Sequence, residues 1–112
     1  LIELPLATIV WRGRRWPVAG GGYWRVSPLR LLDHVVTRIN AESRPVVTYF
    51  HPYEFDEHRL CATRAAGWSV ETVKRSLTQN LGRASMFRKL DAMLARHRFV
   101  AAEDYLHAHG LL

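Results

Sequence analysis

Hydrophobic residues in the first part of the chain predict two strands separated by a helix. Residues 2–10 are rich in β-branched and other apolar side chains, which favour a strand. Ser27 before Pro28 is typical of a helix start, with the serine as N-cap. The apolar positions of this helix, at helical spacing, are Leu29, Leu32, Val36 and Ile39. Residues 45–51 form a continuous apolar run, which suits a strand buried on both faces of a parallel sheet.

Glycines interrupt this pattern at two places. Gly13 lies at the tip of a tight turn between two short extended pieces, and residues 17–22 form a glycine-rich loop. The order strand, helix, strand indicates an α/β fold, with a right-handed crossover between the two main strands.

The second part of the chain is predicted to be helical after a polar loop over residues 51–67. Ser69 caps a helix that breaks near Gly82. A second helix covers residues 85–97, and a short last helix covers 102–109. One face of the longer helix is apolar through Met86, Leu90, Met93 and Leu94. We therefore expect one continuous unit, with strands and a helix in residues 1–60 and a helical extension in residues 61–112.

Composition narrows the class of protein. The 112 residues are 48% hydrophobic, enough for a core, which excludes a disordered chain. A single cysteine excludes an intramolecular disulfide framework and a cysteine-rich zinc module. The net charge of +6 comes largely from scattered arginines, so nucleic-acid binding is the less favoured interpretation. Apolar runs are too short to span a membrane.

His51 is the main candidate for chemistry, because it ends a predicted strand and precedes Pro52. The alternative is a loop histidine that is hydrogen-bonded to the backbone. Functional side chains gather where parallel strands end, and an imidazole exchanges protons near neutral pH. Glu54 follows three residues later and either orients the imidazole or serves as a cap or solvated carboxylate. The remaining histidines have no spacing typical of a metal site.

The stretch from Gly20 to Arg25 is the second candidate. Gly21 and Gly22 allow a ligand to approach the backbone, Tyr23 offers a stacking surface, and Arg25 can bind a carboxylate or phosphate. The alternative is a flexible turn whose aromatic residues belong to the core. The spacing alone leaves both interpretations open.

These motifs, Gly-Gly-Gly-Tyr-Trp-Arg at residues 20–25 and Tyr-Phe-His-Pro-Tyr-Glu at residues 49–54, resemble a known family. They are similar to the C-terminal part of NodB-homology polysaccharide deacetylases, and among these to the subgroup of exosortase-linked exopolysaccharide loci. That subgroup has Phe where this chain has Trp24, and Trp where it has Tyr53. The resemblance spans nearly the whole chain.

The resemblance implies the last part of a distorted (β/α) barrel with a C-terminal helical extension. It also implies metal-dependent removal of N-acetyl groups from amino-sugar polymers, with His51 as the general acid. The substrate-binding residues that it implies are Gly21, Gly22, Tyr23, Arg25, Tyr49 and Glu54. The family's Asp-Asp and His-x-x-x-His motifs, which hold a zinc-like divalent metal and supply the base, are not in this sequence. We therefore expect the metal ligands in a preceding part of a longer bacterial protein, and no activity from this chain alone.

The implied partners are an N-acetylated polysaccharide and the rest of the deacetylase chain, and a second copy of the chain in a homo-oligomer is a further candidate. No nucleic acid and no membrane span are expected, and the location implied is cytoplasmic. The alternative functions are a non-catalytic glycan-binding or oligomerisation module and, less favoured, a basic nucleic-acid-binding domain.

Overall fold

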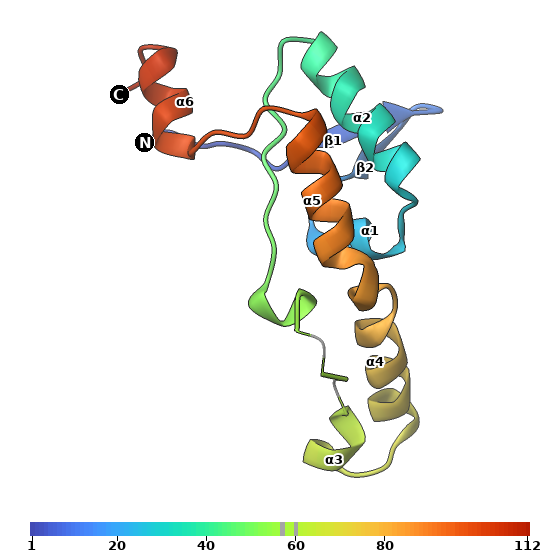
Figure 1. Ribbon diagram of the computed structural model, residues 1–112. Coiled ribbons are helices and arrows are strands. Elements are labelled where there is room, and N and C mark those ends of the chain that lie inside the picture. The colour runs from blue at the N-terminus through green and yellow to red at the C-terminus, as the bar shows by residue number, and fades with distance from the viewer. Residues whose placement is uncertain (57, 60) are drawn as a thin grey trace.

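The computed structural model describes residues 1–56, 58–59 and 61–112. The molecule measures 52 × 33 × 29 Å along its principal axes, so it is elongated. Figure 1 shows both termini near one end and helices α3 (Ala62–Ala66) and α4 (Val70–Asn80) at the other. The body between them contains a small hairpin, helix α1 (Gly21–Val26), helix α2 (Leu29–Ala41) and helix α5 (Met86–Arg96).

The hairpin pairs β1 (Thr8–Trp11) with β2 (Arg14–Pro17) in antiparallel register. Its two turn residues, Arg12 and Gly13, have φ of 51° and 74°. Two positive φ values identify the type I′ geometry that matches the twist of paired strands, which confirms the predicted turn at Gly13. The strand predicted over residues 2–10 is confirmed only in its last part.

The segment of residues 45–51 is extended but is not a buried strand, so that prediction is wrong. Its parallel pairing is limited to one bridge between Tyr49 and Gly20. The Gly21 N–H donates to the Tyr49 carbonyl at 3.2 Å, and the Tyr49 N–H donates to the Ala19 carbonyl at 3.2 Å. Most side chains of the segment are half-buried or exposed. An apolar run indicates extended backbone, but it does not specify which elements lie next to that backbone. Here the described residues pair with only one edge of the segment.

Helix α1 begins inside the stretch predicted to be a glycine loop, and α2 begins one residue later than predicted, with Pro28 as its N-cap. Helices α4, α5 and α6 (Ala102–Ala108) lie where the sequence predicts them, but the loop predicted over residues 51–67 is wrong in part, because it contains the 3-10 helix η1 (Pro52–Glu54) and helix α3. Ser69 caps α4 by accepting from the Thr72 N–H at 3.1 Å, and Gly82 ends that helix region with φ of 75°. The 3-10 helix η2 (Arg83–Ser85) lies directly before α5.

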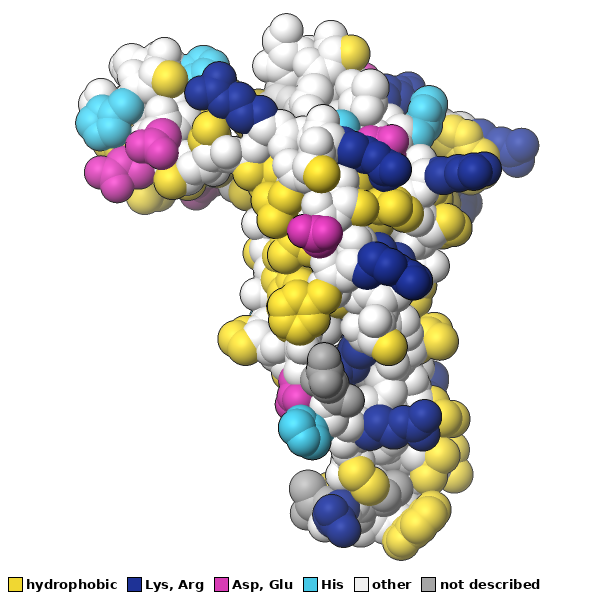
Figure 2. Space-filling view, in the orientation of Figure 1, with side chains coloured by type: hydrophobic (Ala, Val, Ile, Leu, Met, Phe, Trp, Pro, Cys, Tyr) yellow, Lys and Arg dark blue, Asp and Glu magenta, His cyan; other side chains and the backbone are white. Residues whose placement is uncertain are grey.

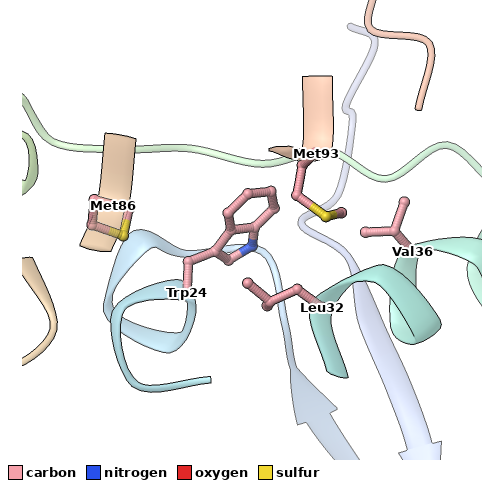
Figure 3. Packing of buried hydrophobic residues seen from close by; sticks show 5 residues of the cluster. All are labelled: Trp24, Leu32, Val36, Met86 and Met93. Atoms are coloured by element: carbon pink, nitrogen blue, oxygen red, sulfur yellow. The ribbon is translucent and has the colours of Figure 1, made fainter. Parts of the chain in front are cut away.

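Trp24 of α1 lies at the centre of the main core, between α2 and α5 (Figure 3). The buried members of this cluster are Trp24, Leu32, Val36, Met86 and Met93. A smaller cluster holds the hairpin base against α2 through Ala7, Ala19, Val35 and Ile39. Leu94, predicted to lie on the apolar face of its helix, is instead half exposed. Both clusters are small because each is built from only two or three short elements.

The accessible surface is 8590 Å², whereas a monomeric protein of this mass exposes roughly 6,300 Å². Figure 2 shows hydrophobic side chains open to solvent along one face of the body. The chain therefore buries less of itself than an ordinary domain of its length.

Candidate functional site

His51 stands between the extended segment and η1, and a reciprocal pair of hydrogen bonds fixes its backbone. The His51 N–H donates to Oε2 of Glu54 at 2.9 Å, and the Glu54 N–H donates to the His51 carbonyl at 2.9 Å. Pro52 at the first position of η1 favours this turn, because its ring presets φ. Glu54 therefore caps a turn, as one of the two sequence interpretations has it. Its described hydrogen bond is to the backbone of His51 and not to the imidazole.

Two tyrosines flank the imidazole. The His51 ring stacks on Tyr53, with centroids 5.4 Å apart and planes inclined by 15°. The Tyr49 ring meets it edge to face, with centroids 5.6 Å apart. All three side chains are exposed, and we call them the His51 cluster. The cluster presents a proton-exchanging group within an aromatic surface, and such surfaces stack on flat apolar faces of ligands.

A buried ion pair lies beneath the cluster. Glu54 is only 1% exposed, and its Oε1 lies 3.7 Å from Nε of Arg25, which is 8% exposed. The Arg25 guanidinium also donates to the carbonyl of Gln79. The Arg25 side chain is therefore buried and points to partners inside the protein. The prediction that it contacts a ligand does not agree with this geometry. The charge of Arg25 instead holds the carboxylate that fixes the backbone of His51.

The middle glycine of the Gly20–Gly22 run, Gly21, is needed for packing. A Cβ built on Gly21 would collide with the carboxylate of Glu54. Gly21 lies at the start of α1 and does not have a positive φ, so close approach of Glu54 explains the residue. Gly22 is exposed, and the nearest atom to a Cβ there is an Arg25 nitrogen at 3.8 Å. Neither Gly21 nor Gly22 has a positive φ, so the backbone conformation does not require glycine at either position.

The two aromatic residues of this stretch, Tyr23 and Trp24, lie in different environments. Trp24 is buried, and its indole N–H donates to the carbonyl of Val18 at 3.1 Å, which confirms the core alternative for this residue. Tyr23 is exposed and lines a cavity beside the hairpin, and the described lining of that cavity includes none of the three rings of the His51 cluster. Of the predicted site residues, Gly21, Arg25 and Glu54 therefore pack together next to the His51 backbone. Tyr49 contacts the His51 ring, whereas Tyr23 lines the cavity beside the hairpin.

Tyr53 belongs to the site, although the sequence does not single it out as a candidate. The resembling subgroup has Trp at this position, and here the Tyr53 ring carries the stacking contact with the imidazole. Alternate residues of extended backbone share a face, so the spacing of Tyr49 and His51 is a signal for part of the cluster, whereas Tyr53 lies in η1 and the strand alternation does not place it.

The described residues do not fit a catalytic metal ion. They contain no group of three or more His, Cys, Asp or Glu side chains placed to bind one. The described histidine–carboxylate contacts are pairs, such as His97 Nε2 with Asp33 Oδ1 at 2.8 Å. Among the described residues, moreover, no helix has the length and apolar character needed to cross a bilayer.

Comparison with known proteins gives one match. Residues 1–107 match a family model described as Domain of unknown function (DUF3473). No curated protein and no solved structure matches the chain.

Proposed function

Since the chain belongs to the DUF3473 family, a domain found at the C-terminus of polysaccharide deacetylases, we propose that it completes the substrate site of such an enzyme. The substrate class is a polymer of N-acetylated amino sugars, and the reaction is hydrolysis of the acetamide bond. Membership of the NodB-homology type and of the exosortase-linked subgroup, suggested by the motifs at residues 20–25 and 49–54, is part of this proposal.

The observation that carries the proposal is the His51 cluster on its fixed base. An acetamide leaves as an amine only when a proton reaches its nitrogen, and an imidazole is suited to donate one near neutral pH. Tyr53 holds the imidazole plane by stacking, while the Glu54 carboxylate fixes the backbone. The exposed rings of Tyr49 and Tyr53 offer apolar faces against which a pyranose ring can stack.

The described residues do not form a binding site for the metal that the resemblance implies. What this chain contributes is the proton donor and an aromatic binding surface. The large accessible surface supports a role as part of a bigger body. So does the extended segment 45–50, whose backbone pairs with other described residues along one edge only. A further strand could pair there and continue a barrel.

The test uses the full-length protein that carries this domain. His51→Ala should lower kcat for acetate release from N-acetylglucosamine oligomers by about 10²–10⁴-fold, the range for losing a general acid. The matched control is His109→Ala, because His109 is also an exposed histidine stacked on a tyrosine, with ring centroids 4.0 Å apart. The control should keep activity, and both variants should keep the metal content of the parent. Unchanged turnover in His51→Ala, or loss of its metal, contradicts the proposal.

A non-catalytic glycan-binding role is the second candidate, because the exposed tyrosines of the cluster serve binding whether or not His51 donates a proton. It is distinguished by Tyr53→Ala and His51→Ala in the same protein. Under the binding role both variants weaken oligosaccharide affinity to similar degrees and no acetate is released by the parent. Under the catalytic role His51→Ala lowers kcat, while Tyr53→Ala also raises KM.

A further inference from the structure

Aromatic and cationic side chains lie next to one another at the hairpin tip. Residues 11–16 read Trp-Arg-Gly-Arg-Arg-Trp, and we call them the Trp/Arg hairpin. Trp11 and Trp16 are each about half exposed, and their rings meet with centroids 6.5 Å apart. The Arg12 guanidinium lies over the Trp11 ring, 4.9 Å from its centroid. None of these residues belongs to the His51 cluster or to the core clusters.

A cavity of about 410 Å³ lies between this hairpin and α2. Its lining includes the aromatic rings of Trp11, Trp16 and Tyr23 and the apolar side chains of Leu31 and Val35. That volume falls within the ~300–1,000 Å³ of pockets that hold small molecules or parts of them. The described lining is largely hydrocarbon, so the cavity suits an apolar chain better than a polar molecule.

The charge around the cavity has one sign over a long stretch of chain. Between Glu3 and Asp33 the sequence contains five arginines and no acidic residue. Four of them, Arg12, Arg14, Arg15 and Arg30, are exposed, and the fifth is the buried Arg25. Figure 2 shows basic side chains gathered at the upper right, where Figure 1 places the hairpin and α2.

Other charged groups near the cavity do not reverse this. His34 and Arg38 of α2 line it, and Arg38 Nε lies 4.0 Å from Oε1 of Glu42, one turn further along the helix. Arg15 donates to the hydroxyl of Thr8 at 3.3 Å, a neutral partner. The surface of the hairpin is therefore cationic, with aromatic rings between the charges.

We propose that the Trp/Arg hairpin docks the protein onto an anionic lipid surface, with an acyl chain entering the cavity behind it. Tryptophan rings favour the boundary between headgroups and hydrocarbon, where one edge is apolar and the other wet. Arginines bind lipid phosphates bidentately, and each basic residue near an anionic membrane strengthens attachment. A glycan fits the same place less well, because the lining is largely hydrocarbon and, among the described residues, includes no Asp, Glu, Asn or Gln side chain to pair with sugar hydroxyls. This inference does not depend on the proposed deacetylase role.

The test is sedimentation with vesicles at low and high salt. The protein should bind vesicles made of equal parts phosphatidylglycerol and phosphatidylcholine, and should not bind phosphatidylcholine alone. Because each arginine contributes to attachment, the triple variant Arg12→Gln, Arg14→Gln, Arg15→Gln should bind roughly a hundred-fold more weakly. The matched control, Arg75→Gln, Arg88→Gln, Arg96→Gln, removes equal charge from exposed sites on α4 and α5 and should bind nearly as the parent does.

Tryptophan fluorescence locates the contact. Emission should shift to the blue on binding, and the shift should disappear in the double variant Trp11→Ser, Trp16→Ser. Trp68, which is 87% exposed beside α4, is the control, and Trp68→Phe should retain the shift. Circular dichroism of each variant confirms that the helices are intact.

Several results overturn the proposal. Among them are the absence of binding to phosphatidylglycerol vesicles, equal binding to phosphatidylcholine alone, and equal weakening by the control arginine variant. A blue shift produced by an N-acetylglucosamine oligomer or a single-stranded oligonucleotide, with no vesicle binding, also overturns it and assigns the hairpin to that ligand.

Discussion

The carboxylate of Glu54 occupies the space that a side chain at Gly21 would need. The two residues are far apart in sequence, yet the first residue of α1 and the last residue of η1 are packed against each other. Through this contact the start of α1 supports the turn that carries His51. Substitutions there should act on the fold first and on chemistry second.

Gly21→Ala should lower the free energy of unfolding by about 1–3 kcal/mol, the usual cost of inserting a methyl group where no room exists. Gly22→Ala is the matched control, because its Cβ would meet only an ordinary contact at 3.8 Å in an exposed helical position. Alanine there should leave stability unchanged or raise it slightly. Urea unfolding of both variants measures the difference, and equal effects would contradict the packing role of Gly21.

Glu54→Gln should destabilise the protein by about 3 kcal/mol, because it leaves the buried Arg25 guanidinium without a counter-charge. Adding Arg25→Met to Glu54→Gln should cost much less than the sum of the two single changes, since the double variant buries no unpaired charge. A double-mutant cycle by urea unfolding measures this coupling. Additive losses would show that the 3.7 Å pair contributes little.

Lys89→Met tests a tie between α5 and α1. The Lys89 ammonium donates to the carbonyls of Trp24 and Arg25 at 2.8 and 2.7 Å, and burial lowers the pKa of this amine. Losing these charged hydrogen bonds should cost about 1.5–3 kcal/mol in thermal or urea unfolding. Lys74→Met, at an exposed position of α4, should change stability by less than about 0.5 kcal/mol. Similar losses in both would assign the effect to charge alone.

Asp56 provides a test by titration. The backbone N–H and the ring of His58 both bond to its carboxylate at 2.9 Å and hold the pKa of Asp56 below its ordinary value, the backbone contact most strongly. The stabilisation from these contacts is present above the ordinary pKa of a carboxyl and is lost as the pH falls through the lowered pKa. His58→Ala keeps the N–H, so an NMR titration should still find a lowered pKa for Asp56. Full return to the ordinary pKa would show that the ring dominates.

Local signals in the sequence predict helices α4, α5 and α6 well, but not α3, which lies in a predicted loop. Ser69 offers its hydroxyl to a free N–H of the next turn, and Gly82 adopts the left-handed backbone that ends a helix region. Both effects act within a few residues, so the sequence near each position is enough. The segment 45–51 was predicted wrongly because the burial of an extended segment depends on which elements cover it, and those lie far away along the chain.

The candidate site divides in the same way. His51 and the capping alternative for Glu54 follow from neighbouring residues, and the structure confirms the cap. The inward direction of Arg25 does not follow, because its partners Glu54 and Gln79 belong to η1 and α4. The spacing within residues 20–25 therefore does not distinguish an arginine that binds a ligand from one that is buried.

The large surface left accessible by the folded chain also affects its response to temperature. An unfolded chain of 12.9 kDa exposes roughly 18,700 Å², so folding here buries about a fifth less area than in an ordinary domain of this size. The heat-capacity change of unfolding is set mainly by the apolar part of that area. Calorimetry should therefore find a low heat-capacity increment and a flat dependence of stability on temperature, with cold and heat unfolding both gradual.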